Sequence, residues 1–401
     1  MRLMFVADAR SPTALNWIEY FLNKDHEVHL VSTFPCLGDS RLASFELISV
    51  AFSGLKKFKP QELKTKNILP QRRTSQFLTG ASALRLRTAV RQWLGPLSLP
   101  AASEQLRKVV ERVQPELVHA LRIPFEGMVS ALAEIPAPLL VSIWGNDFTL
   151  HATSAILMKK YTQITMQRAN GLNADCHRDI RLAQTWGYSI EKPFMVIPGS
   201  GGVQPTIYYP APEVENPADR LVTAKTVINP RGFRAYVCNQ AFFYSIPLVL
   251  AKHSDTRFIC PGMAGEAQAI RWVNQLGLQG YVELLPHQTR QQMATLFRNS
   301  RVSVSPTIHD GTPNTLLEAM ACGCLPIAGD LESIREWIIP GSNGLLVDPT
   351  DPNDIAVAIV QALEDEILNQ SARQLNLKLI EEKASYPVMM QKAEGFYKNY
   401  V

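Results

Sequence analysis

Short apolar runs separated by amphipathic stretches follow one another along most of this chain. Residues 2–6 form the first run, and Leu15, Ile18 and Phe21 then recur at the spacing of one helical face. A bounded apolar run predicts a buried strand, whereas a period of 3.6 residues predicts an amphipathic helix. By the same patterns we expect strands at residues 27–33, 116–120, 138–144, 171–175 and 193–198, and helices at 77–94, 104–113 and 155–169.

The second half of the chain repeats this alternation with little interruption. Short strands separated by helices indicate parallel, right-handed βαβ units. We therefore predict an α/β fold with two doubly wound, Rossmann-like domains. In this half, strands are expected at 225–229, 256–262, 281–286, 301–306, 324–329 and 344–349, and helices near 236–250, 265–276, 289–299, 313–322, 331–338 and 352–365.

The domain boundaries follow from a Gly- and Pro-rich stretch without periodicity, which we interpret as a linker over residues 199–217. The N-terminal domain is expected over residues 1–198 and the C-terminal domain over 218–375. A final helix within residues 376–401 is expected to cross back to the N-terminal domain. Because ligands of doubly wound sheets bind at the carboxyl ends of the strands, we expect the site in a cleft between the two domains.

Composition excludes several classes of protein. With 401 residues, 46% hydrophobic and 19% charged, the chain is expected to form two packed domains rather than a disordered one. We find no window of about 18 apolar residues without charge, and the first apolar run is too short for a secretion signal. The six cysteines are scattered without zinc-binding spacing. We therefore expect reduced thiols in the cytoplasm and no metal site.

Positive charge is concentrated in residues 56–95, which hold ten basic residues and one acid in a chain of net charge +4. This stretch fits either a solvated loop with a helical face or a surface drawn to an anionic membrane. Attraction to such a membrane contributes about 1 kcal/mol per basic side chain near it. The second reading implies a peripheral position on the inner face of the membrane. Few aromatic residues are interleaved and no recognition motif is present, so nucleic acid is not an expected partner.

Two acids, Asp310 and Glu318, stand eight residues apart with no basic residue between them. Gly311 would let a ligand approach the backbone closely. Helical side chains lean toward the helix N-terminus, so Glu318 can reach back toward that ligand. We expect the two carboxylates to accept hydrogen bonds from hydroxyl groups on either side of a bound phosphate. The alternative is a loop cap and an acid on a helix surface.

A helix start between the two acids would supply the positive charge that a phosphate needs. Pro313 suits the first helical position, and Thr312 before it suits the N-cap. The free N–H groups at such a helix start form an anion site. These groups are expected on Asn314, Thr315 and Leu316.

Residues 309–359 resemble the nucleotide-sugar-binding region of retaining glycosyltransferases of the GT-B fold, family 4 type, also called glycosyl transferases group 1 and found in bacterial polysaccharide assembly. In that family the first acid contacts hydroxyls of the donor sugar and the second holds the nucleotide ribose. Here Asp310 replaces the usual Glu and is one methylene shorter. The resemblance rests on Asp310-x7-Glu318, Ala319-Met320-Ala321, Pro326, Asp330, Glu336 and residues 341–347.

The resemblance also implies cationic groups for the donor diphosphate. The family places an Arg and a Lys five residues apart after the first strand of its second domain. Arg231 matches the Arg, Tyr236 stands in place of the Lys, and Arg234 is the nearby basic substitute. A guanidinium can bind phosphate oxygens bidentately. Gly262 and His287 stand where loops of the family surround the nucleotide base.

The acceptor side of the resemblance lies in the N-terminal domain. The family often has a His near the reacting carbon, and Trp144 stands at that place here. Asp147 is our first candidate for acceptor-side catalysis and His119 the second. Each of them fits a structural hydrogen bond at least as well.

The reaction implied by the resemblance is transfer of a hexose from a nucleotide-sugar, UDP-glucose or a similar UDP-hexose, to a hydroxyl of a glycan or lipid-linked acceptor. The anomeric configuration would be retained, without a metal, and the nucleotide-sugar would be the donor substrate rather than a cofactor. Arg231, Asp310 and the helix start would act where charge develops on the leaving diphosphate and the sugar. The expected enzyme is therefore a metal-independent hexosyltransferase.

Two other functions stay open at this stage. A nucleotide-sugar 2-epimerase of the same fold would convert its substrate without an acceptor. A non-catalytic partner subunit would bind a nucleotide-sugar and release no sugar. A dehydrogenase is not expected, because no G-x-G-x-x-G follows the first strand of either domain.

Overall fold

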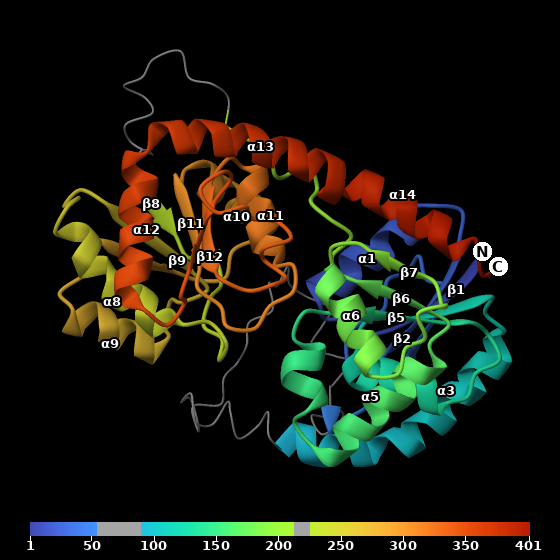
Figure 1. Cartoon of the computed structure of the whole chain (residues 1–401). Helices are drawn as coiled ribbons and strands as arrows, with labels where there is room; N and C mark the ends of the chain where they lie inside the picture. Colours follow the sequence, from blue (N-terminus) through green and yellow to red (C-terminus); the bar gives the residue numbers. More distant parts are fainter. Residues whose placement is uncertain (54–89, 212–224) are drawn as a thin grey trace. The chain divides into compact units, whose positions relative to one another are not determined.

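The computed structural model describes residues 1–53, 90–211 and 225–401, which form two compact units (Figure 1). The first unit comprises Met1–Ala174, Asp179–Met195 and Gly395–Val401, and the second Asp175–Arg178 and Val196–Glu394. Most of the predicted helix at 77–94, most of the basic stretch 56–95 and the end of the predicted linker lie outside the described residues. No helix in the described part is long and apolar enough to cross a lipid bilayer.

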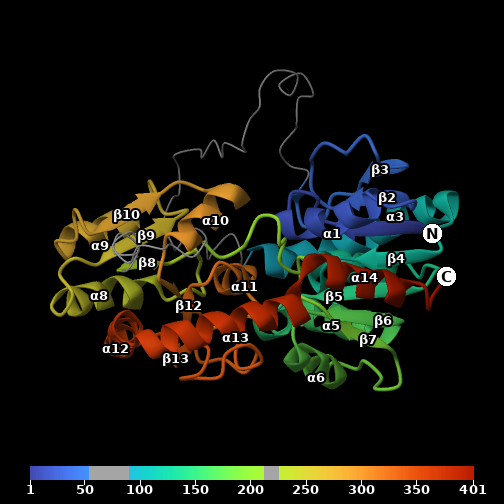
Figure 2. The same ribbon diagram turned by 90° about the horizontal axis from the view of Figure 1, so that it is seen from above.

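The first unit is built on a seven-stranded sheet in the order β3-β2-β1-β4-β5-β6-β7. Strand β1 (Arg2–Ala7) is buried along most of its length and pairs in parallel with β2 (Glu27–Ser32) and β4 (Leu117–Ala120). Figure 2 shows β3, β2, β4, β5 and β6 following one another across the sheet. The remaining strands are β3 (Ser44–Leu47), β5 (Leu139–Ile143), β6 (Gly171–Ala174) and β7 (Phe194–Val196).

Helices of the first unit follow its strands in sequence. Helix α1 (Pro12–Leu22) begins with Pro12 at its first position, and the hydroxyl of Ser11 accepts a hydrogen bond from the Ala14 amide. Trp17, Ile18 and Phe21 form its buried face. The other helices are α3 (Leu99–Val113), α4 (Met128–Leu132), α5 (Ile156–Arg168) and α6 (His177–Thr185), with short turns η3 (Gly95–Ser98), η4 (Ile123–Gly127) and η5 (Asp147–Ala152). The first two residues of α6, His177 and Arg178, belong to the second unit.

The second unit has a six-stranded parallel sheet in the order β10-β9-β8-β11-β12-β13. Its strands are β8 (Thr226–Ile228), β9 (Arg257–Pro261), β10 (Val282–Leu285), β11 (Val302–Ser305), β12 (Leu325–Gly329) and β13 (Leu345–Val347). Its helices are α8 (Asn239–Leu250), α9 (Ala267–Gln275), α10 (Arg290–Arg298), α11 (Asn314–Ala321), α12 (Pro352–Glu364) and α13 (Glu366–Ala384). The expected class, two doubly wound α/β sheets, is confirmed.

The strand order of each sheet reverses at one point. In the first sheet β1 lies between β2 and β4, and in the second β8 lies between β9 and β11. At such a point the connections on the two sides leave toward opposite faces of the sheet, which opens a crevice at the carboxyl ends of the strands. The loops after β1 and β4, and those after β8 and β11, are therefore the places to look for ligand-binding residues.

The structure differs from the predicted elements in several details, and helices α4 and α6 were not predicted. The segment 331–338 forms successive turns rather than a regular helix. Asn343 closes this segment, because its side chain accepts the Ile339 amide at 2.7 Å and donates to the Trp337 carbonyl at 2.9 Å. Strand β3 was not predicted, since it is a four-residue, partly exposed edge strand without a long apolar run.

The end of helix α14 (Tyr386–Tyr397) completes the core of the first unit. The side chain of Tyr397 is fully buried, and its ring stacks on Phe21 with centroids 4.8 Å apart. Its hydroxyl accepts a hydrogen bond from Trp17 Nε1 at 2.9 Å. Residues almost at the end of the sequence thus fill a space beside the first helix of the chain.

Candidate active site

Arg231 and Asp310 meet at the carboxyl edge of the second sheet, where its strand order reverses. Arg231 follows β8 and Asp310 follows the neighbouring strand β11, so both loops emerge at the same sheet edge. The Arg231 guanidinium donates from Nη2 to Asp310 Oδ2 at 2.5 Å, with the two side chains only 6% and 15% exposed. Its Nη1 donates to Thr315 Oγ1 at 3.1 Å, in the first turn of α11. Two predicted site residues, Asp310 and Thr315, therefore converge on the guanidinium of a third, Arg231.

The Nε of Arg231 is buried and has no hydrogen-bond partner among the described residues. A buried donor left unpaired costs about 1–3 kcal/mol, so this N–H is suited to receive an oxygen from a ligand. The loop that carries Arg231 is firmly held. Its amide donates to Asn229 Oδ1 at 3.2 Å, and the Asn239 side chain donates to the Gly232 carbonyl at 3.0 Å.

The Asp310 loop is fixed through its main chain. Its carbonyl accepts hydrogen bonds from Arg178 Nη1 at 2.6 Å and from Ser333 Oγ at 2.8 Å. The Glu336 carboxylate in turn accepts the amides of His177 and Arg178, at 2.8 and 2.9 Å. Sequence reasoning did not find the roles of Arg178 and Ser333, because each joins Asp310 only through the folded chain.

The start of α11 differs from the prediction by one residue. The N-cap is Pro313 rather than Thr312. The Thr312 hydroxyl donates instead to the Asp175 carbonyl and accepts from Trp337 Nε1 at 2.8 Å. Because these buried neighbours occupy the hydroxyl, it does not cap the helix. The Leu316 amide is also not free, because it donates to the Pro313 carbonyl at 3.0 Å. Gly311 before these residues is buried.

Asn314 and Thr315 remain as the first amides of α11, beside the Arg231 guanidinium. The Asn314 side chain is oriented by the Ser200 hydroxyl, which donates to its Oδ1 at 2.9 Å. A helix start carries partial positive charge, and here it lies next to a buried arginine. The two elements together favour an anion.

The Glu318 carboxyl is desolvated, although the residue as a whole is only partly buried. Burial raises the pKa of its carboxyl to about 7, although a hydrogen bond from Tyr208 and the charges of Arg290 and Arg231 act in the opposite direction. A carboxyl with this pKa changes its charge near neutral pH. Tyr208 is a further residue that the sequence pattern did not identify.

This raised pKa predicts a specific dependence of stability on pH. The folded protein holds the Glu318 proton up to about pH 7, whereas the unfolded chain releases it near the ordinary value of 4.5. The Glu318 contribution therefore destabilises the fold as pH rises from about 4.5 to 7, by at most about 3 kcal/mol. Glu318→Gln should remove this fall, as measured by urea unfolding at several pH values. The exposed Glu283→Gln is the control, and equal pH profiles for Glu318→Gln and wild type would contradict the assignment.

The structure brings two further predicted donor-side residues, Gly262 and His287, together, and leaves a third, Arg234, exposed. Gly262 has a φ of 75°, in the left-handed region, and a Cβ added there would lie 3.4 Å from the His287 ring. These two residues therefore face each other at the carboxyl ends of β9 and β10. Arg234 is exposed, and its Nη1 donates to the Tyr236 hydroxyl at 2.9 Å. The structure thus links Arg234 to the residue that replaces the family Lys.

His119 lies in the core of the first unit. Its Nε2 is 2.9 Å from Ser142 Oγ, and its Nδ1 is hydrogen-bonded to the Tyr397 hydroxyl. Burial lowers the pKa of the imidazole to about 3, so it stays neutral. Both ring nitrogens are occupied by neighbours within the unit.

Asp147 is also buried and fully engaged. Its carboxylate accepts from Arg122 Nε at 2.8 Å and from the amides of Trp144 and Ile123 at 3.1 and 3.3 Å. Burial raises the pKa of the Asp147 carboxyl, and the Arg122 charge opposes this effect. Asp147 therefore ties the loop after β5 to the loop after β4.

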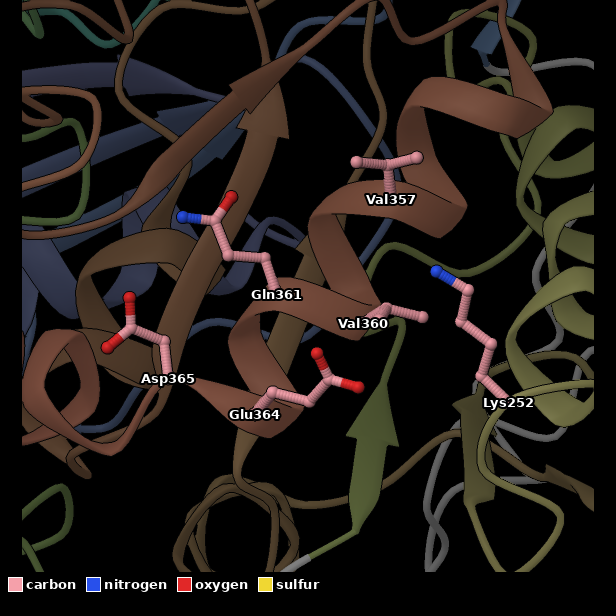
Figure 3. Close-up of a pocket in the computed structure, with 6 residues that line it drawn as sticks. All are labelled: Lys252, Val357, Val360, Gln361, Glu364 and Asp365. Carbon is pink, nitrogen blue, oxygen red and sulfur yellow. The ribbon is translucent and has the colours of Figure 1, made fainter.

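A pocket of about 340 Å³ lies elsewhere in the second unit (Figure 3). It is found where α8 and α12 approach their C-terminal ends. Helices in βα units run opposite to the strands, so these ends lie on the amino side of the sheet. The pocket is therefore not part of the Arg231 site. Its lining residues are Lys252, Val357, Val360, Gln361, Glu364 and Asp365.

Comparison with known families finds one match in the second unit. Residues 238–365 match the family described as glycosyl transferases group 1. The O-antigen chain mannosyltransferase B of Escherichia coli is 28% identical over 110 residues, which is 27% of this chain and 28% of that protein. The alignments with the first curated relatives thus span about a quarter of the length of those proteins.

Solved structures resemble the chain over its whole length. Sucrose-phosphate synthase from Thermosynechococcus elongatus has a TM-score of 0.74 at 14% identity, covering 100% of this chain and 99% of that one. Anabaena HepE in complex with UDP and glucose has a TM-score of 0.69 at 13% identity, with 100% of both chains covered. At these identities the likeness concerns the fold.

Proposed function

We propose that this chain, whose residues 238–365 match the glycosyl transferases group 1 family and which has the GT-B fold, transfers a hexose from a nucleotide-sugar to a hydroxyl group. The proposed donor is UDP-glucose or a similar UDP-hexose, and the acceptor a glycan or lipid-linked glycan in polysaccharide biosynthesis. The proposed acceptor is supported by a relative described as an O-antigen chain mannosyltransferase. The proposed donor is supported by a structural neighbour with bound UDP and glucose.

The observation that carries this proposal is the arrangement around Arg231. Asp310 and Thr315 hold the guanidinium beside the start of α11, and its buried Nε is left without a partner in the described chain. A donor diphosphate bound here would receive N–H groups already in place. Such preorganised donors stabilise the charge that grows on a leaving group as its bond to the sugar breaks.

For the acceptor step we propose that the leaving phosphate oxygen takes the proton of the attacking hydroxyl. The new glycosidic bond would then form on the face from which the diphosphate departs, which retains the anomeric configuration. His119 and Asp147 support this choice, because neighbours within the first unit occupy the polar atoms of both. We propose structural roles for these two residues. Glu318, beside Tyr208, would hold the nucleotide ribose.

Calorimetric titration with UDP-, GDP- and ADP-sugars tests the donor site. We expect one nucleotide to bind saturably and Glu318→Ala to weaken that binding about tenfold or more, since the hydrogen bonds between the ribose and the Glu318 carboxyl are lost. The exposed Glu283→Ala is the matched control. The proposed donor site fails if no nucleotide-sugar binds or if Glu318→Ala binds unchanged. Conversion of the donor to its epimer without acceptor would indicate an epimerase, and binding without any sugar release a non-catalytic subunit.

Chelation tests the proposal that no metal takes part. Arg231 and the α11 start are proposed to neutralise the diphosphate, a task that a divalent cation performs in other transferases. Initial rates of sugar transfer should therefore be the same with and without EDTA. A rate that EDTA lowers and Mg²⁺ or Mn²⁺ restores would contradict the metal-independent mechanism.

A further inference from the structure

A second arginine site, which is partly buried, lies where the strand order of the first sheet reverses. The guanidinium of Arg91 lies over the rings of Phe34 and Phe125, at 4.8 and 4.7 Å from their centroids. Phe34 follows β2 and Phe125 follows β4, the strands on either side of β1. Arg91 therefore occupies the point where the strand order of this sheet reverses, as Arg231 does in the second sheet. It is also the one basic residue of the stretch 56–95 among the described residues.

The other arginines at this edge are already paired. Arg10 binds Asp8 bidentately, with both distances 2.9 Å, and Arg122 binds Asp147 at 2.8 Å. In the described part of the chain no ion pair joins Arg91 to a carboxylate, and its buried Nε has no hydrogen-bond partner. Stacking on two rings stabilises a cation but leaves the N–H groups at the edge of its plane for an acceptor.

Neighbouring titratable groups leave the positive charge of Arg91 only partly compensated. Burial raises the pKa of Glu126 to about 7, so this carboxyl is about half protonated at neutral pH. Its Oε1 is already engaged, because it accepts from Thr33 Oγ1 at 2.6 Å. Burial lowers the pKa of His151 to about 3, with further lowering by Arg122 and Arg91, so the imidazole is neutral.

The backbone beneath Arg91 is strained. Phe125 has φ 72° and ψ −56°, a conformation that is rare for a residue with a side chain. It places the Phe125 ring against the guanidinium and directs the next residue, Glu126, onto Thr33. Strain of this kind costs about 1–3 kcal/mol and is concentrated at functional sites.

We propose that Arg91 anchors a second anion site, which binds a phosphoryl group of the acceptor. A guanidinium that lies between two rings and has no ion pair within the described residues offers the planar pair of donors that fits phosphate oxygens. The assignment to the acceptor rests on the proposed transferase function; the anion site itself rests on Arg91 and its surroundings. The phosphate belongs either to a soluble ester or to a lipid headgroup.

Titration with pyrophosphate tests the site directly. The Arg231→Gln background removes the donor-side guanidinium, so that remaining binding reports on the first unit. In this background we expect saturable pyrophosphate binding, detected by calorimetry, that Arg91→Gln weakens about tenfold or more and Arg91→Lys weakens less. Arg107→Gln, an exposed residue paired with Glu104 on α3, should leave binding unchanged. Thermal unfolding of every variant verifies that the first unit remains folded.

Binding that is equal with and without Arg91→Gln would overturn the proposal, as would no saturable binding at all. Displacement of pyrophosphate by glycerol 3-phosphate would identify a soluble ester as the source. Binding to phosphatidylcholine vesicles that requires both phosphatidic acid and Arg91 would identify a lipid headgroup. If neither glycerol 3-phosphate nor these vesicles bind, the proposal is contradicted. A protein that shows the Arg91 effect but binds no nucleotide-sugar would keep the anion site and reject the transferase. Donor binding with no Arg91 effect would reject the anion site alone.

Discussion

Replacing Arg231 by glutamine is expected to lower kcat/KM for the nucleotide-sugar about 100- to 1,000-fold, the usual effect of removing one preorganised donor from a developing negative charge. The loss should fall mainly on kcat, because charge on the diphosphate is greatest as the glycosidic bond breaks. Glutamine keeps part of the volume and a hydrogen-bond donor for Thr315, but it removes the cation. Steady-state kinetics with the donor identified by titration would measure the effect.

Two further variants separate charge from structure in this experiment. Arg234→Gln should have a much smaller effect, because Arg234 is exposed and donates to the Tyr236 hydroxyl. Asp310→Asn should lower the rate even with Arg231 intact, since the carboxylate positions the guanidinium at 2.5 Å. If Arg231→Gln retained nearly full kcat, the leaving-group role of Arg231 would be wrong. A loss confined to KM would instead place Arg231 in ground-state binding.

Replacing Tyr397 by alanine is expected to destabilise the first unit by about 3–5 kcal/mol, the range for removing a large aromatic side chain from a core. The fully buried ring is stacked on Phe21, and its loss would leave a cavity beside α1. Tyr397→Phe should cost about 1–3 kcal/mol, because it keeps the ring but leaves Trp17 Nε1 without its acceptor. Hydrogen exchange of peptides from β1 and α1 would measure both effects in the first unit.

A matched control lies three residues further along. Tyr400 is partly exposed and its hydroxyl donates to the Asn170 carbonyl at 3.3 Å, so Tyr400→Phe should change stability by no more than about 0.5 kcal/mol. Peptides from β8 and β11 report on the second unit and should exchange as in wild type. Protection of β1 and α1 that is unchanged in Tyr397→Ala would show that the tail is not part of that core.

The fold was predictable wherever apolar runs are long and bounded. The apolar run at residues 2–6 became β1, because buried parallel strands need apolar residues on both faces. In β11 only Val302 and Val304 are apolar, and they alternate with two buried serines. Strand β3 escaped detection because an edge strand is stabilised by its neighbour β2 rather than by its own composition. Residues 331–338 have helical spacing, but the hydrogen bonds of Asn343 outweigh local propensity there.

The donor-side site was predictable where its residues share a local pattern. Asp310 and Thr315 were identified from one loop and helix start, and the structure brings Arg231 to both of them. The residues that hold this group were not predictable, because Arg178 and Tyr208 are remote in sequence from the acids they contact. The prediction of Thr312 as the N-cap was wrong for the same reason, because Trp337, which is remote in sequence, binds the Thr312 hydroxyl.

The first unit shows a second reason for incomplete prediction. Arg91 was grouped with a basic stretch by charge alone, whereas its environment depends on Phe34 and Phe125, which come from two other loops. His119 and Asp147 were selected because they end or follow strands. Sequence position identified the sheet edge correctly but could not tell which polar atoms would already be bonded there.

The buried position of Tyr397 also determines when the first unit can finish folding on the ribosome. The strands of that unit are complete once β7 has been made, yet Tyr397 is added roughly 200 residues later, at about 5–20 residues per second. For roughly 10–40 s the nascent first unit therefore has a gap beside Phe21 and an unsatisfied Trp17 indole. During that interval the half-finished core is exposed to chaperones and proteases, although it was synthesised first.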